Sequence, residues 1–175
     1  MTTEPIVESG MRFGPYPEGH CFHIEQSKTY QRIKKDQVKI AEFLLYRNTN
    51  PPTLLIIEAK SSSPRPETQP DFDEFIAEIQ EKFSNTLHLF IATRLKRHPT
   101  WSECSEIFQN IDLEIGGFRL ILIINGHQEE WLPPLQDALR QALKPIVKIW
   151  NLESPSVAVM NEDMAQEQGI IEVAE

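Results

Sequence analysis

The sequence predicts an α/β domain in which a β-hairpin belongs to a mixed central sheet flanked by helices. Two apolar stretches rich in strand-forming residues, 38–46 and 54–60, are separated by the turn residues 48–52, which is the pattern of an antiparallel hairpin. A third apolar stretch, 118–125, is followed by a helical segment and then by a short stretch at 156–160. This strand–helix–strand order favours a parallel crossover, so the sheet contains both strand directions.

Prolines and glycines recur at close intervals in the first 19 residues, which predicts an arm without a regular element, residues 1–19, ahead of a single domain, residues 20–175. The segment that opens this domain fits two interpretations. Alternating polarity over 20–27 is typical of a strand, whereas Ser27 followed by Tyr30 and Lys34 is typical of a capped helix. The sequence alone leaves both open.

The predicted hairpin places two acids opposite each other. If it is symmetric about Asn50, the numbers of opposed residues sum to 100, so Glu42 pairs with Glu58. Side chains alternate along a strand, so Glu58 and Lys60 project from the same apolar face as Ile56. Buried charges need a partner, and a divalent cation between the two acids would turn their repulsion into ligation.

One long helix should cover a face of the sheet. Asp71 and Glu74 form a capping-box pattern after the loop at 61–70, and apolar positions keep helical spacing up to about Leu95. Gln80 lies at the border of the apolar stripe, where its side chain either reaches the acids or faces solvent.

The last third of the chain completes the sheet. Residues 97–115 are predicted as an irregular connection, and the β-branched residues 118–125 as a buried central strand. Pro133 and Pro134 suit the first turn of the helix that follows. Residues 161–171 predict a short acidic helix that ends at a glycine.

The acids and the lysine of the hairpin together indicate phosphate chemistry. Carboxylate oxygens, completed by water and substrate phosphate, suit Mg²⁺ or Mn²⁺ rather than a metal that prefers thiolates. Such an ion can polarise a phosphoryl oxygen and help generate hydroxide. Lys60, on the same face, can orient or deprotonate the attacking water or stabilise charge on the phosphate.

At these residues the sequence resembles the PD-(D/E)xK phosphodiesterase superfamily, whose members have the restriction-endonuclease-like fold. The resemblance implies that Glu42 is the first metal-binding acid, Glu58 the second and Lys60 the catalytic lysine. It also implies that the backbone carbonyl of Ala59 is a metal ligand. The chain departs from the common pattern at Ala41 and Glu42, where many members have Pro-Asp.

The resemblance extends to residues outside the hairpin. A helix ahead of the hairpin often supplies another acid in this superfamily, which makes Glu25 the candidate, ahead of Glu18. A polar residue from the long helix sometimes joins the site, and Gln80 stands there. The function implied is a Mg²⁺- or Mn²⁺-dependent nuclease that hydrolyses phosphodiester bonds in nucleic acid, with DNA as the expected substrate.

The charge of the chain bears on this expectation. The 175 residues include 17 basic and 26 acidic side chains, a formal charge of −9, which is unusual for a protein that holds a polyanion. The excess acid is concentrated in residues 101–175, which carry 4 basic and 13 acidic side chains. Two basic groups remain near the hairpin in sequence: Lys28, Arg32, Lys34, Lys35 and Lys39, and Arg94, Lys96, Arg97 and His98.

The acidic balance also supports a different class of function, a non-catalytic protein-interaction module with the same fold. A third interpretation is a subunit of a larger nucleic-acid-processing complex, and a protein partner or a homodimer fits either. The sequence shows no run of eighteen apolar residues and no signal-peptide pattern, so we expect a cytoplasmic protein without membrane contact. Cys21 and Cys104 are too few for a disulfide framework. His20, Cys21 and His23 resemble zinc ligands in type but lack a second pair, so we expect packing there.

Overall fold

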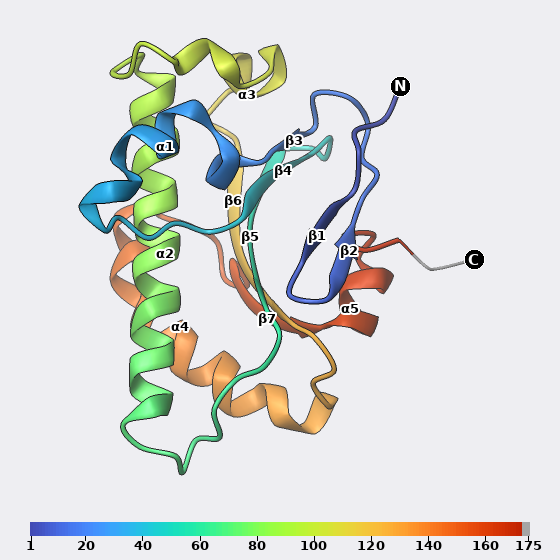
Figure 1. Ribbon diagram of the computed structural model, residues 1–175, viewed down its shortest axis with the longest axis vertical. Helices are drawn as coiled ribbons and strands as arrows, with labels where there is room; N and C mark the ends of the chain where they lie inside the picture. The colour runs from blue at the N-terminus through green and yellow to red at the C-terminus, as the bar shows by residue number, and fades with distance from the viewer. Residues whose placement is uncertain (173–175) are drawn as a thin grey trace.

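A five-stranded mixed sheet forms the centre of the computed structural model, which describes residues 1–172 (Figure 1). The strand order is β3-β4-β5-β6-β7, with β3, β4 and β5 antiparallel and β5, β6 and β7 parallel. The strands are β3 Cys21–Phe22, β4 Phe43–Arg47, β5 Thr53–Lys60, β6 Gly117–Ile124 and β7 Val157–Asn161. The predicted α/β class, with its mixed sheet and flanking helices, is confirmed.

The β4–β5 hairpin has the predicted register. Leu44 pairs with Ile56 and Tyr46 with Leu54, so the numbers of opposed residues sum to 100. Strand β4 is shorter than the expected 38–46, because the backbone N–H of Ala41 donates to the Thr86 hydroxyl of helix α2 at 2.7 Å and not to β5. Strand pairing in β4 therefore begins only at Phe43, the residue after Glu42.

Two long helices, α2 Asp71–Arg94 and α4 Leu132–Ile149, cover one face of the sheet, as the left side of Figure 1 shows. The long helix is confirmed, but the expected cap is wrong: Asp71 is its first residue, Pro70 precedes it, and no side chain caps it. Prolines do occupy the first turn of α4. The segment 97–115, expected to be irregular, contains the 3₁₀ helix η3 Trp101–Glu103 and helix α3 Glu106–Asn110.

The N-terminal residues are not an arm without structure. Strands β1 Ile6–Glu8 and β2 Met11–Phe13 form an antiparallel hairpin that packs on the second face of the sheet, together with α5 Glu162–Glu167. Alternation drives this packing, since Met11 and Phe13 are buried and Arg12 between them is exposed. Gly10, with a φ of 77°, lies in the turn of this hairpin, and the prolines that predicted an irregular arm lie outside its two strands.

Both interpretations of residues 20–35 hold, each for a different part. A short strand, β3, is followed by the 3₁₀ helix η1 Ile24–Gln26, helix α1 Lys28–Ile33 and the 3₁₀ helix η2 Lys34–Asp36. Ser27 caps α1, because its hydroxyl oxygen accepts the backbone N–H of Tyr30. The predicted acidic helix at 161–171 is confirmed as α5. Within residues 1–172, no helix combines the length and apolar character that a membrane crossing requires.

Candidate functional site

The two acids of the hairpin are buried next to each other. Glu58 lies on β5 with no exposed surface, and Glu42, the residue before β4, is 7% exposed. The backbone N–H of Glu42 donates to the Ile57 carbonyl at 3.0 Å, one residue out of the register that pairs Phe43 with Ile57, and this bond holds Glu42 at the end of the hairpin near Glu58. In each carboxylate one oxygen, Oε2, is buried without a hydrogen-bond partner.

Lysines compensate Glu58. Lys82 on α2 donates to Glu58 Oε1 at 2.7 Å, and Lys60 Nζ lies 3.7 Å from the same oxygen. Lys60 donates to Glu78 Oε1 at 2.7 Å, and the Lys39 ammonium lies 3.7 Å from Glu78 Oε2. Burial raises the pKa of Glu58, against the opposing effect of Lys82. Burial lowers the Lys82 pKa, but the Glu58 carboxylate more than reverses this, so the net shift is upward.

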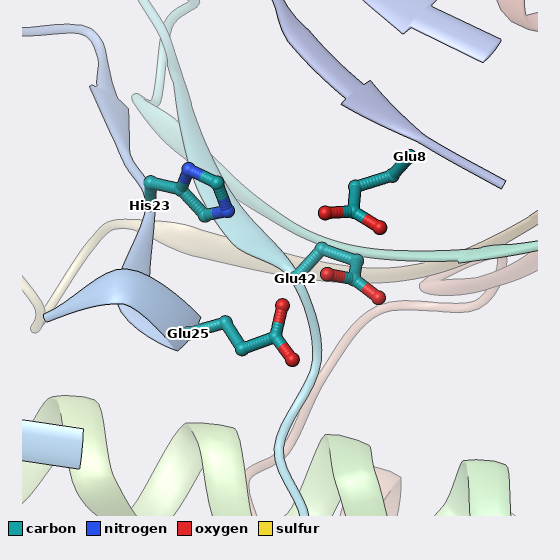
Figure 2. A group of neighbouring side chains, drawn as sticks. All are labelled: Glu8, His23, Glu25 and Glu42. Carbon is teal, nitrogen blue, oxygen red and sulfur yellow. The ribbon is translucent and has the colours of Figure 1, made fainter. Parts of the chain in front are cut away.

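Two further acids and one imidazole lie close to Glu42. Figure 2 shows the side chains of Glu8, His23, Glu25 and Glu42 pointing toward one another. Each offers one ligand atom, and these four atoms all lie within 4.8 Å of one another. Glu8 ends β1, His23 lies between β3 and η1, and Glu25 belongs to η1. The Glu25 N–H donates to the Glu42 carbonyl at 3.3 Å.

The cluster of Glu8, His23, Glu25 and Glu42 contains no lysine or arginine. Burial, the adjacent Glu25 side chain and the nearby charge of Glu58 raise the pKa of Glu42 to about 9. Burial lowers the pKa of His23, which keeps its ring neutral at pH 7, and its Nε2 atom is buried without a hydrogen-bond partner. A histidine binds a metal ion as the neutral imidazole, and a carboxyl group such as that of Glu42 binds one after it has released its proton.

The structure brings together four of the residues that the sequence singled out, namely Glu25, Glu42, Glu58 and Lys60. The Ala59 carbonyl lies in the same strand and accepts a hydrogen bond from the Ser9 hydroxyl at 3.1 Å.

Gln80 does not reach the acids. Its amide donates to the Ala142 carbonyl of α4 at 2.9 Å, so it joins two helices, and it neither contacts the site nor faces solvent freely. Lys82, half a turn further along α2, faces the site instead.

Sequence reasoning missed four residues of this region: Glu8, His23, Glu78 and Lys82. Lys82 was recognisable in part, since it lies four residues after Glu78 on a predicted helix and so shares its face. Glu8 belongs to the segment expected to be an unstructured arm. His20, Cys21 and His23 do not form a zinc-like set: His20 packs edge-to-face against Tyr46, with ring centroids 5.2 Å apart.

Of the two basic groups, only one reaches the acids. Lys39 pairs with Glu78, which in turn pairs with Lys60. Arg94 is held by the carbonyls of Phe108 and Ile111, and it lies twelve residues from Lys82 on the same helix, about 18 Å away. Comparison with family models, curated proteins and solved structures finds no match.

Proposed function

We propose that this chain is a metal-dependent nuclease of the restriction-endonuclease-like type. The observation that carries the proposal is the convergence of Glu42, Glu58 and Lys60 at the end of the β4–β5 hairpin, the three positions that the resemblance to the PD-(D/E)xK superfamily singles out. The order of elements also agrees, since a helix crosses over from β5 to the parallel strand β6 directly after the acid-x-Lys triplet.

The residues present fit a divalent cation. Glu42 and Glu58 each keep a buried oxygen without a partner, and an unpaired buried acceptor is costly unless an ion or a donor satisfies it. Oxygen ligands suit Mg²⁺ or Mn²⁺. When bound, such an ion would polarise the phosphoryl oxygen and lower the pKa of a water molecule.

Lys82 and Lys60 would have different roles in such a site. Lys82, 15% exposed, is committed to the buried Glu58 and fixes that carboxylate in place. Lys60 is 25% exposed and lies between Glu58 and Glu78, so its ammonium remains accessible from solvent. An ammonium in this position stabilises charge that develops on a phosphate or orients the attacking water.

DNA is the substrate class that we propose, and the distribution of charge is compatible with it. The lysines of the site and the basic residues of α1 and η2 belong to the half of the chain that is close to neutral. Phosphate contacts from such residues supply most of the non-specific affinity for a nucleic acid.

One observation favours a second function, a non-catalytic protein-interaction module. The ammonium groups nearest the acids are already paired with carboxylates of the chain, at 2.7 Å for both Lys82 to Glu58 and Lys60 to Glu78. Such pairing stabilises the fold without any substrate. In that case the acid-rich last third of the chain is the expected binding surface.

Cleavage of supercoiled plasmid DNA with Mn²⁺ or Mg²⁺ tests the proposal. We expect the wild type to nick the plasmid only when metal is present, and Lys60→Met to lower the rate at least a hundredfold. Lys144→Met is the matched control, because Lys144 is an exposed lysine of α4, and it should cleave like the wild type. A wild type without metal-dependent cleavage, or a Lys60→Met variant as active as the control, would overturn the nuclease assignment.

A further inference from the structure

We infer that the ion bound at Glu42 is also held by Glu8, His23 and Glu25, in a mixed nitrogen and oxygen site that joins the N-terminal hairpin to the sheet. The inference rests on the proposed function only in supposing that a divalent ion binds at Glu42. It assigns ligands that the acid-x-Lys pattern does not contain.

The size of the cluster fits one ion. Bonds from a first-row divalent ion to carboxylate oxygen or imidazole nitrogen are roughly 2.0 to 2.2 Å, so ligand atoms on opposite sides of it are about 4.3 Å apart. The four ligand atoms of Glu8, His23, Glu25 and Glu42 lie within 4.8 Å of one another. This upper limit exceeds the separation of opposite ligands by about 0.5 Å, so the cluster is close to the size that one ion spans.

Unpaired atoms inside the cluster provide a second, independent observation. Glu42 is more than nine-tenths buried, and its Oε2 atom has no hydrogen-bond partner. The Nε2 atom of His23 is also buried without a partner. A structural cluster would satisfy these atoms with donors and acceptors of the chain, as Lys82 satisfies one oxygen of Glu58.

The charges of the region leave room for one divalent ion. Five carboxylates meet here, and three ammonium groups accompany them, which leaves two formal negative charges when all are ionised. The carboxylates are Glu8, Glu25, Glu42, Glu58 and Glu78, and the ammonium groups are Lys39, Lys60 and Lys82. The ammonium groups all pair with Glu58 or Glu78, so the uncompensated charge lies at the other three acids.

The chain holds Glu8 in position without an ion. The next residue, Ser9, donates its hydroxyl to the Ala59 carbonyl at 3.1 Å and accepts the Asn125 amide at its own carbonyl at 3.0 Å. Ser9 and Gly10 both have left-handed backbone angles, with φ of 51° and 77°, which close the turn tightly after Glu8. Two strands of the central sheet therefore fix the turn that delivers this carboxylate.

The ligand set also selects the ion. Mg²⁺ prefers oxygen ligands and keeps several water molecules, whereas imidazole suits the borderline first-row ions. Three carboxylates and one neutral imidazole therefore favour Mn²⁺ over Mg²⁺, and His23 is the residue that makes the difference.

Calorimetric titration with Mn²⁺ and with Mg²⁺ tests the inference on the full chain, without any substrate. We expect the wild type to bind one Mn²⁺ more tightly than Mg²⁺, and Glu8→Gln and His23→Gln each to weaken Mn²⁺ binding at least tenfold. His23→Gln should also remove the preference for Mn²⁺. Glu18→Gln, which changes an exposed acid of the same N-terminal segment, is the matched control and should bind like the wild type.

Electron paramagnetic resonance of the wild type with bound Mn²⁺ gives a readout that needs no variant to fold. Coupling of the ion to a ¹⁴N nucleus is expected, because the His23 ring is a ligand, and an oxygen-only spectrum would overturn the inference. Glu58→Gln separates the two proposals. If it abolishes Mn²⁺ binding while Glu8→Gln binds like the wild type, the ligand assignment fails and the nuclease proposal stands. If Mn²⁺ binds as inferred and DNA stays intact, the nuclease proposal fails alone.

Discussion

Two neighbouring acids of this site have opposite surroundings. Glu58 on β5 is completely buried, yet a lysine donates to it at 2.7 Å and a second ammonium lies 3.7 Å away. Glu42, its neighbour across the hairpin, faces Glu8, Glu25 and a neutral imidazole. The fold thus pairs Glu58 with two ammonium groups, whereas Glu42 has no ion-pair partner among the described residues. An acid that the chain itself does not compensate is where an external cation has the most to contribute.

Removing the internal cation should have the largest effect. Lys82→Met leaves Glu58 buried without its closest partner, and breaking a buried pair in this way costs about 3 to 5 kcal/mol. We expect urea denaturation to show a loss of this size in the free energy of unfolding. The double variant Glu58→Gln/Lys82→Met should recover most of it, since no charge is then buried alone. Lys144→Met on α4 is the control, and an equal loss there would contradict the comparison.

Neutralising Glu42 should raise the free energy of unfolding, whereas removing Lys82 should lower it. The pKa of Glu42 is raised from 4.5 to about 9 in the folded chain, so between these values the folded state keeps a proton that the unfolded state has released. The stability of the metal-free protein should therefore be highest near pH 5 and fall as the pH rises toward 9. Glu42→Gln should flatten this dependence and raise the free energy of unfolding at pH 8 by about 1 kcal/mol or more.

Chemical denaturation at several pH values, in the presence of a chelator, measures this effect. Glu18→Gln, an exposed acid without a contact to the cluster, should keep the slope of the wild type. A Glu42→Gln variant with the same slope as the wild type would show that Glu42 is ionised without cost, and the contrast with Glu58 would disappear.

The same contrast marks what the sequence could predict. The hairpin register followed from local pattern, because a short turn and two apolar strands fix which residues face each other. Glu42 and Glu58 could therefore be placed together from the sequence alone. Their different partners could not, because Lys82 and Glu8 reach them from elements 24 and 34 residues away in sequence. Contacts of that kind depend on tertiary packing rather than on a local period.

The N-terminal hairpin shows this most clearly. Its strands have only three residues each, too short for a period to stand out between glycines and prolines. What makes them strands is the apolar second face of the sheet, which Met11 and Phe13 cover. The position of the carboxylate that this hairpin brings to the cluster, Glu8, therefore depends on packing that no local pattern reveals.

The smallest effect on the free energy of unfolding is expected at Lys39, the most exposed of the three lysines near the acids. Lys39 is 51% exposed at its side chain, and its ammonium lies 3.7 Å from Glu78 Oε2, beyond the Lys60 contact. Exposed pairs of this kind contribute about 0 to 1 kcal/mol, because water already solvates both charges. Lys39→Met should therefore change the free energy of unfolding by less than about 0.5 kcal/mol, with Mn²⁺ affinity unchanged in calorimetry. If Lys39→Met lowered the free energy of unfolding as much as Lys82→Met, the three lysines would stabilise Glu58 as one network. The burial of each lysine would then not determine how much it contributes.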